Sequence, residues 1–211
     1  NSHATFLLVV SSIKIEALQN NLLIKMKVIK LHTEEQQLIE HAIQNNRHAQ
    51  HQLYNTYAAK MLGVCRNYIK DIHEAEDVMI SSFMKVFTHL AAFENKGSFE
   101  GWIRRIMINE CLSYLRVKKK VNFIEDQTQS EFSYQEHELQ FTAEELQALI
   151  DKLPEGYKMV FNLYVVEGYK HHEIAELLHI SEGTSKSQLS HARKYLQELI
   201  EKTTNYQNGT K

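Results

Sequence analysis

The sequence predicts an all-α protein made of two small helical domains joined by a flexible acidic linker. Only one proline and seven glycines occur among its 211 residues, which leaves little material for tight turns and hairpins. Apolar residues recur three or four positions apart over long segments, which is the spacing of one buried helix face. A hydrophobic fraction of 43% and a charged fraction of 24% are typical of a folded globular chain.

Residues 1–30 are expected to form an N-terminal extension, of which the part through Lys25 is either an expression scar or upstream translated sequence. The apolar run at residues 6–10 is too short for a signal peptide and has no basic leader. No apolar run approaches the ~18 residues of a membrane span, so membrane insertion is not expected. Cys65 and Cys111 lie in helical patterns without a C-x-x-C spacing and are expected to be core thiols. These features indicate a cytoplasmic protein.

Residues 31–120 are expected to form the first domain, with four helices. A capping box of Thr33 and Gln36 starts the first helix. The stretch Glu94–Gly97 is a turn signal, and Ser98 is placed to cap the fourth helix. The four helices are expected at residues 33–46, 47–70, 73–92 and 98–118.

Residues 121–140 are expected to be the flexible acidic linker, and residues 141–203 the second domain. No lysine or arginine occurs between Val121 and Asp151, whereas glutamate and aspartate accumulate there. The helical pattern resumes at Ala143 and continues from Pro154 to about Gly168. Two further helices, EIAELL from Glu173 and a long final one, complete the domain.

The last two helices have the pattern of a helix-turn-helix, in which the second helix enters the major groove of DNA. Ser181 is placed to cap the final helix, whose buried stripe is expected to include Leu189 and Ala192. The opposite face carries short polar and basic side chains, which suit base edges and phosphates. The alternative interpretation is an amphipathic helix with a solvated charged face. The expected DNA-binding residues are Lys186, Ser187, Ser190, His191, Arg193 and Lys194.

Two helices of the first domain carry polar strips. On the fourth helix, Arg105, Asn109, Ser113, Arg116 and Lys120 recur on one side with Trp102 beside them, and Phe93 and Phe99 flank the preceding turn. Basic residues next to aromatic ones suit single-stranded nucleic acid, but the aromatics also fit a core, and the cations fit a helix C-terminus. On the third helix, Glu74, Asp77, Ser81, Lys85 and Thr88 form a strip that is either solvated surface or a protein contact.

Other classes of function fit the sequence less well. It contains no Gly-rich phosphate loop and no nucleophile elbow, so no catalysis is expected. The histidines at 48, 51, 171 and 172 lack further ligands at the spacing of a metal site. A helix-turn-helix regulator of the response-regulator type is the closest alternative, but it needs an α/β receiver domain. A purely structural helical adaptor would not need two cationic faces.

Three segments in this order resemble an extracytoplasmic-function (ECF) sigma factor, a bacterial transcription initiation factor. They are HEAEDVMISSFMKVF, FENKGSFEGWIRRIMINECLSYLRVKKK and LPEGYKMVFNLYVVEGYKHHEIAELLHISEGTSKSQLSHARKYLQEL, and the resemblance extends from about Thr33 to Lys202. It implies that residues 31–120 are sigma region 2, which binds core RNA polymerase and melts the minus-ten element. It also implies that residues 141–203 are sigma region 4, which reads the minus-thirty-five element.

The resemblance further implies partners and site residues. The partners are core RNA polymerase, through its β′ coiled coil and β flap, promoter DNA, and an anti-sigma factor; no cofactor, metal or small-molecule substrate is implied. In the free protein, either the two domains pack together or the anti-sigma factor hides both nucleic-acid faces. Ile80, Ser81 and Ser82 stand where the family often has glutamine and glutamate, and Lys170 and His171 replace its usual serine or threonine cap. The implied polymerase contacts are Asp77, Glu74 and Ser81, and the implied minus-ten residues are Asn95, Lys96, Ser98, Trp102, Arg105, Asn109, Arg116 and Lys120.

Overall fold

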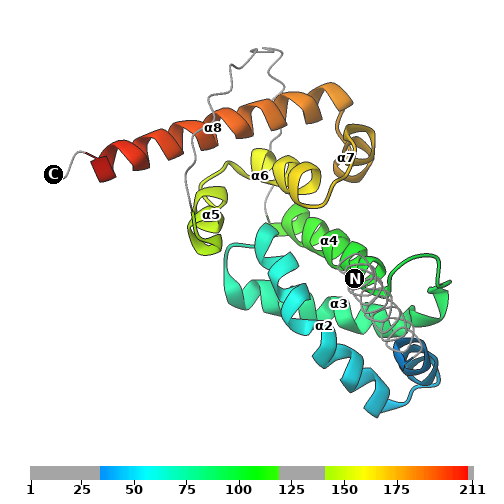
Figure 1. Cartoon of the computed structure of the whole chain (residues 1–211). Coiled ribbons are helices and arrows are strands. Elements are labelled where there is room, and N and C mark those ends of the chain that lie inside the picture. The colour runs from blue at the N-terminus through cyan, green and yellow to red at the C-terminus, as the bar shows by residue number, and fades with distance from the viewer. Residues whose placement is uncertain (1–33, 119–140, 209–211) are drawn as a thin grey trace, which may run out of the picture. The chain divides into compact units, whose positions relative to one another are not determined.

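The computed structural model of the chain describes residues 34–118 and 141–208, and every regular element within these two ranges is a helix (Figure 1). The all-α prediction is confirmed for this part of the chain. The expected N-terminal extension and the expected linker lie outside the described residues.

The chain divides into two compact units that are each interrupted in sequence. The described part of Asn1–Tyr57 and the segment Val86–Lys96 form one unit, and Ala58–Lys85 with the described part of Gly97–Lys211 form the other. The second unit therefore combines helices from both halves of the sequence.

The first unit contains a helix at residues 34–43, the beginning of α2 (Arg47–Tyr68) and the 3₁₀ turn η1 (Leu90–Ala92). The first helix ends before Asn46 because Asn45 has a left-handed backbone with φ of 61°. The Asn46 side chain instead caps α2 by accepting from the amides of His48 and Ala49 at 3.0 and 3.2 Å. The buried apolar residues of this unit are Ile39, Ala42, Ala49, Leu53, Tyr57, Val86 and Leu90.

The second unit begins with the end of α2, most of α3 (Ile72–Thr88) and α4 (Phe99–Lys118). Asp71 caps α3 by accepting from the amides of His73 and Glu74 at 2.9 and 3.1 Å. The sequence extends this helix to Ala92, but α3 ends at Thr88 and the chain continues as η1. The buried side chains of the three helices in this unit include Met61, Val64, Met79, Phe83, Phe99, Ile103, Met107, Ile108, Leu112 and Leu115.

Cys65 of α2 and Cys111 of α4 are both buried free thiols of this core, as the sequence predicted. A hydrogen bond with Cys65 raises the pKa of the Cys111 thiol well above its usual value, and burial raises it further. The Cys111 thiol therefore stays protonated, and both buried cysteines pack as small apolar groups.

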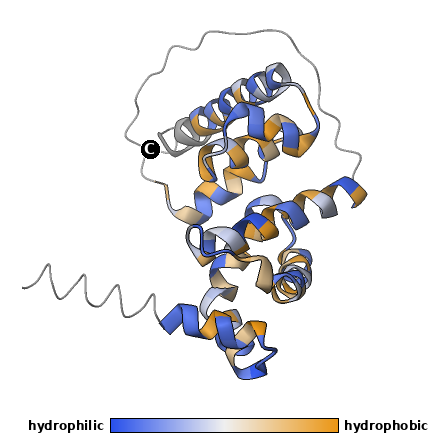
Figure 2. Cartoon of the chain, turned by 90° about the vertical axis from the view of Figure 1, so that its right-hand side faces the viewer, coloured by the Kyte–Doolittle hydropathy of each residue, from blue (hydrophilic) through white to orange (hydrophobic). Residues whose placement is uncertain are grey.

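The remainder of the second unit consists of α5 (Ala143–Ile150), α6 (Glu155–Phe161), the π-helical segment η2 (Asn162–Val166), α7 (His171–Leu178) and α8 (Glu182–Asn208). Thr142 and Glu145 cap α5 reciprocally, with hydrogen bonds of 3.2 and 2.9 Å. Helices α6 and α7 pack on α8, and hydrophobic and hydrophilic residues alternate along each of these helices (Figure 2). Their shared core includes Met159, Val160, Leu163, Ile174, Leu189 and Ala192.

Candidate nucleic-acid interface

Helices α7 and α8 form the predicted helix-turn-helix. The turn begins at His179, whose left-handed backbone with φ of 56° ends α7. Ser181 then accepts from the amide of Thr184 at 2.9 Å and so caps α8, as the sequence predicted. Because Ile174 and Leu189 are buried, the first turns of α8 are held against α7 and present their opposite side to solvent.

The structure exposes only part of the predicted DNA-binding face. Lys186, Arg193 and Lys194 are exposed, whereas Ser187 and Ser190 are half-buried. The Ser187 hydroxyl donates to the Thr184 carbonyl of its own helix at 3.2 Å. The side-chain ammonium of Lys186 lies 3.7 Å from Glu182, one turn earlier, and both side chains are more than half exposed. The cations of this face are therefore accessible to a ligand.

His191 differs from the rest of the face. Its ring stacks on Tyr157 of α6 with centroids 5.5 Å apart, and its Nε2 atom is buried without a hydrogen-bond partner. The sequence periodicity places His191 beside Ser190 and Lys194, but it does not reveal that α6 covers the ring. The His191 ring therefore packs against α6 and is partly covered on the predicted DNA-binding face.

The structure adds residues that the sequence analysis did not assign to this surface. The ring of His171, at the start of α7, stacks on Tyr164 at 4.6 Å, and its Nδ1 lies 2.9 Å from the hydroxyl of Ser185. The guanidinium of Arg193 lies 6.0 Å from the centre of the Tyr164 ring. Burial lowers the pKa of His171 below its usual value, and the charge of Lys186 lowers it further. The unusual residue pair Lys170 and His171 was the only sign of this cluster in the sequence.

Helix α4 carries the second predicted strip. Arg105, Asn109, Ser113 and Arg116 are all exposed along it, whereas Lys120 lies outside the described residues. Trp102 is half-buried and stacks on the buried ring of Phe99 with centroids 5.9 Å apart. These two aromatics thus contribute to the core, while the cations face solvent.

The loop that leads into α4 has an unusual backbone. Asn95 and Gly97 have positive φ of 55° and 113°, which Asn tolerates and Gly adopts freely. The Lys96 ammonium pairs with Glu94 at 2.6 Å, and both side chains are largely exposed. Ser98 accepts from the amide of Gly101 at 3.1 Å and so caps α4. The polar side chains of this loop are therefore presented to solvent at the helix N-terminus.

On α3 the predicted strip is exposed at Asp77 and Ser81. Glu74 is half-buried and pairs with Lys118 of α4, whose hydrogen bond lowers the pKa of Glu74 below its usual value. Beside Asp77 and Ser81, two apolar side chains that the sequence analysis did not assign to the strip are exposed, Ile80 by 46% and Met84 by 66%. This surface combines a carboxylate with apolar area, which is typical of a protein contact.

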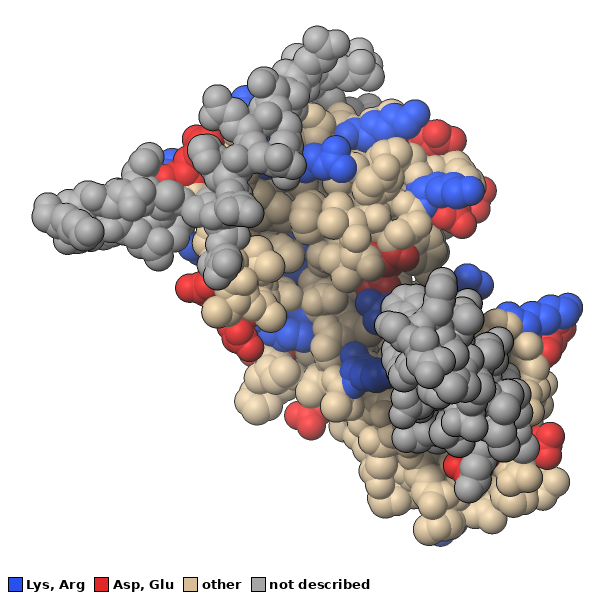
Figure 3. Space-filling view, in the orientation of Figure 1, with Lys and Arg blue, Asp and Glu red and all other residues tan. Residues whose placement is uncertain are grey.

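Basic and acidic side chains of the described residues are interspersed on the face of the molecule shown in Figure 3. Within the described ranges, no group of three or more His, Cys, Asp or Glu residues is arranged to hold a metal ion. In the same ranges, no helix has the length and apolar character needed to cross a membrane.

Comparison with known families gives two matches in chain order. Residues 53–121 match the family model of sigma-70 region 2, and residues 143–196 match that of sigma-70 region 4. Together the two models cover more than half of the chain.

Individual relatives point the same way. The chain is 26% identical over 182 residues to the RNA polymerase sigma-H factor of Pseudomonas aeruginosa, covering 80% of this chain and 94% of that protein. It is 25% identical over 159 residues to the ECF RNA polymerase sigma factor SigM of Bacillus subtilis, covering 73% of this chain and 96% of that protein. Among solved structures, the sigma factor RpoE in complex with the anti-sigma factor NepR from Bartonella quintana aligns with a TM-score of 0.47 and 22% identity, covering 71% of this chain and 95% of that one.

Proposed function

The chain belongs to the sigma-70 family and is an ECF sigma factor, and from this premise we propose which of its surfaces carries each step of promoter recognition. A sigma factor directs bacterial core RNA polymerase to specific promoters and initiates transcription there. We propose that this chain catalyses no reaction of its own and acts in the cytoplasm together with the polymerase. Its partners are then core polymerase, promoter DNA and an anti-sigma factor.

We propose that residues 31–120 form the region 2 domain, residues 121–140 the linker and residues 141–203 the region 4 domain. The two family matches support this division, because they end at 121 and begin again at 143. We propose that the linker acids occupy the basic RNA exit path of the polymerase, because of their negative charge and their position between the two domains.

The region 4 domain is proposed to read the minus-thirty-five element with the first turns of α8. The observation that carries this proposal is the helix-turn-helix in which buried Leu189 and Ala192 leave Lys186, Arg193 and Lys194 exposed. Lys186 and the partly exposed Ser190 are placed for base edges, whereas Arg193, held near the Tyr164 ring, suits a phosphate. Other surfaces of this domain contact the β flap.

The region 2 domain is proposed to melt the minus-ten element and hold one strand. Its exposed cations and amides on α4 supply countercharge and hydrogen bonds, and the Trp102 ring supplies a stacking surface. The loop before α4 is proposed to capture an unstacked base. The residues proposed for this task are Asn95, Lys96, Ser98, Trp102, Arg105, Asn109, Arg116 and Lys120.

The outer surface of α3 is proposed to bind the β′ coiled coil of core polymerase. Asp77 and Ser81 supply the polar contacts, and exposed Ile80 and Met84 supply apolar area beside them. Glu74 contributes mainly by its ion pair with Lys118, which ties α3 to α4.

The test is co-elution of the purified full chain with core RNA polymerase in size exclusion, followed by transcription from a selected promoter. The wild type is expected to bind and the Asp77→Lys variant to bind at least tenfold more weakly, because the charge reversal sits in the centre of the proposed contact. Glu76→Lys, the same charge change on the neighbouring exposed position of α3, is the matched control and is expected to bind nearly as the wild type.

Two outcomes contradict the proposal. If the wild type, free of any inhibitor, does not bind core polymerase, the sigma function fails for this chain. If Glu76→Lys and Asp77→Lys weaken binding equally, the effect is one of overall charge and the contact lies elsewhere.

A further inference from the structure

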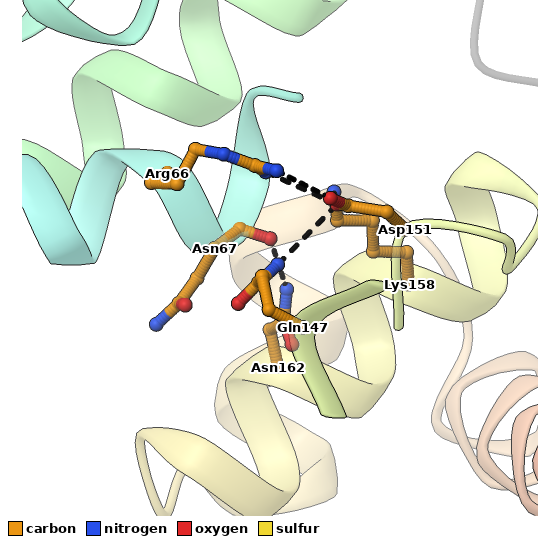
Figure 4. A network of polar contacts seen from close by, with 6 residues as sticks. All are labelled: Arg66, Asn67, Gln147, Asp151, Lys158 and Asn162. Atoms are coloured by element: carbon orange, nitrogen blue, oxygen red, sulfur yellow. Dashed lines mark hydrogen bonds and ion pairs between the residues drawn. The ribbon is translucent and has the colours of Figure 1, made fainter. Parts of the chain in front are cut away.

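Within the second unit, polar contacts join α2 to the segment that contains α5 and α6 (Figure 4). Arg66 of α2 donates to both oxygens of Asp151, at 3.2 and 2.6 Å, and Lys158 of α6 donates to the same carboxylate at 2.5 Å. The side chain of Asn162 donates to the carbonyl of Asn67 at 2.6 Å. Asp151 is therefore shared between one cation of its own domain and one cation of the other.

A second set of contacts joins α4 to the segment around α7. Arg104 donates through two nitrogens to the carboxylate of Glu167, with the Nη2 bond at 2.8 Å. Arg116 donates to the carbonyl of Leu177, in the last turn of α7, at 3.1 Å. Arg116 belongs to the strip proposed to hold the melted strand, so the region 4 segment occupies one of the groups that the DNA needs.

The acids of these contacts are buried and the arginines are not. The Asp151 and Glu167 side chains are 6% and 2% exposed, whereas Arg66 and Arg104 are 28% and 32% exposed. Burial alone raises the pKa of Asp151, but the hydrogen bonds from Arg66 and Lys158 outweigh it and hold this pKa below its usual value. A buried carboxylate that loses its arginine is costly, so Glu167 depends on Arg104 across the contact, whereas Asp151 would still keep Lys158 of its own domain.

The same contact is incompletely packed. A cleft of about 490 Å³ is lined from one side by residues such as Tyr68 and Leu115 and from the other by Leu153 and Lys158. A second cleft of about 270 Å³ lies beside Arg104 and Glu167. Water can enter these clefts and hydrate the polar groups when the two sides separate. Contacts that open and close have this character, whereas a permanent core is closely packed.

We propose that these contacts form a self-inhibitory latch, defined by the pairs Arg66–Asp151, Arg104–Glu167 and Arg116–Leu177, which holds region 4 on region 2 in the free protein. This inference rests on the proposed function, because it takes the α4 strip to be the site of the melted strand. In the closed form Arg116 is engaged by α7, so the strand cannot use the strip in full. Binding to core polymerase and promoter DNA then requires the latch to open.

The strength of the latch suits a switch. The arginines of the two ion pairs are 28% and 32% exposed, so water and salt reach the cations and weaken the pairs. The closed and open forms are then close in free energy. When only a fraction of the molecules is open, the apparent affinity for core polymerase equals the affinity of the open form multiplied by that fraction. If about nine-tenths of the molecules are closed, removing the latch raises the apparent affinity for core polymerase up to about tenfold.

The test uses the full chain with Arg66→Gln and Arg104→Gln together. Both arginines are partly exposed. While the latch is closed, their loss removes the cation paired with Glu167 and one of the two cations paired with Asp151, which keeps Lys158. The radius of gyration from small-angle scattering is expected to increase in the free variant, and helical content by circular dichroism to stay the same. Lys60→Gln is the matched control, because Lys60 pairs with Glu100 at 2.7 Å within region 2 and its loss should leave the radius unchanged.

A charge exchange makes the test specific. Arg104→Glu combined with Glu167→Arg should close the chain again, whereas Arg104→Glu alone should open it further than Arg104→Gln does, because it places two carboxylates together. An unchanged radius in the double glutamine variant, or an equal increase in Lys60→Gln, overturns the latch. An expanded exchange variant overturns the Arg104–Glu167 contact in particular.

The experiment also separates the latch from the proposed function. The radius is measured without polymerase or DNA, so it reports on the latch alone. If the double variant expands but no variant binds core polymerase, the latch stands and the sigma function fails. If the variant keeps its radius and binds polymerase as the wild type does, the sigma function stands and the latch fails.

Discussion

At the scale of single residues, the exposed cations of α8 are held in different ways. Lys186 lies in the first turns of the helix and is only loosely paired, with its ammonium 3.7 Å from the largely exposed Glu182. Arg193 lies farther along α8, with its guanidinium 6.0 Å from the centre of the Tyr164 ring. A loosely held lysine near the N-terminus of a recognition helix can reach into the major groove, whereas a guanidinium fixed by an aromatic ring is better suited to a phosphate.

Replacing Lys186 with alanine is therefore expected to weaken binding to a specific promoter by roughly 1–3 kcal/mol, if its ammonium donates to a base. Lys194→Ala is the comparison, since a phosphate contact weakens all sequences alike. Both variants are measured on a specific and an unrelated duplex at one salt concentration. Equal losses of Lys186→Ala on the two duplexes would reassign that side chain to the backbone.

His171 gives a pH dependence whose direction follows from its surroundings. Burial, with the charges of Lys186 and Arg193, lowers the pKa of His171, while Glu182 opposes them. The unfolded chain therefore takes up the proton at a higher pH than the folded one does. The stability from neutral His171 is present above the ordinary pKa of about 6.5 and is lost as the pH falls toward the lowered value.

The measurement is the melting temperature of the wild type and of His171→Gln from about pH 8 to about pH 5.5. The wild type should lose stability more steeply than the variant over this interval. His172→Gln, one position along, is the control for a histidine-to-glutamine change at the start of α7. Parallel curves for the wild type and His171→Gln would show that the imidazole stacked on Tyr164 is not coupled to folding.

At the scale of elements, the start of α8 depends on one hydroxyl. Ser181 accepts from the amide of Thr184 at 2.9 Å and also lies 2.8 Å from the Thr184 hydroxyl, which is almost buried. Ser181→Ala is expected to destabilise the chain by about 1–2 kcal/mol through loss of the cap. The free energy of unfolding is measured by urea titration. Ser113→Ala, the same change on the exposed side of α4, is the control and should lower it by less than about 0.5 kcal/mol. Equal effects would show that the cap does not hold the helix.

The helices themselves were largely predictable, because period and caps are local. The predicted starts at Arg47, Ser98 and Ala143 agree with α2, α4 and α5 to within one residue, and Ser181 was identified as a cap from its position alone. The π-helical segment η2 was not predicted, since a helix that widens for a few residues keeps nearly the same apolar pattern. The early end of α3 was also missed, because η1 continues its apolar spacing.

The sites were less predictable than the helices. Periodicity assigns a residue to a face of its own helix, and on that basis Lys186, Arg193 and Arg105 were found correctly to be exposed. It does not show which distant element covers that face. For this reason the stacking of His191 on Tyr157 and the engagement of Arg116 by α7 appear only in the structure.

At the scale of the whole molecule, the net charge does not attract DNA. The net charge is −2 with 24 basic and 26 acidic residues, so attraction to DNA must come from local surfaces. Added salt is therefore expected to have two opposite effects on the binding of promoter DNA. It weakens phosphate contacts, with a slope of roughly −0.9 in log affinity against log salt for each neutralised phosphate of a duplex, and it also weakens the ion pairs of the latch.

These opposite effects predict a curved salt dependence. Binding of the full chain to a promoter fragment with an unpaired minus-ten strand should fall gently at low salt, where opening of the latch offsets the lost phosphate contacts. It should fall steeply at higher salt, where most molecules are already open. The variant with Arg66→Gln and Arg104→Gln lacks both ion pairs of the latch, so salt has no latch ion pair left to weaken and its plot should be straight, while Lys60→Gln should keep the curvature. Fluorescence anisotropy over a salt series measures all three, and a straight line for the wild type would mean that salt does not act through the latch.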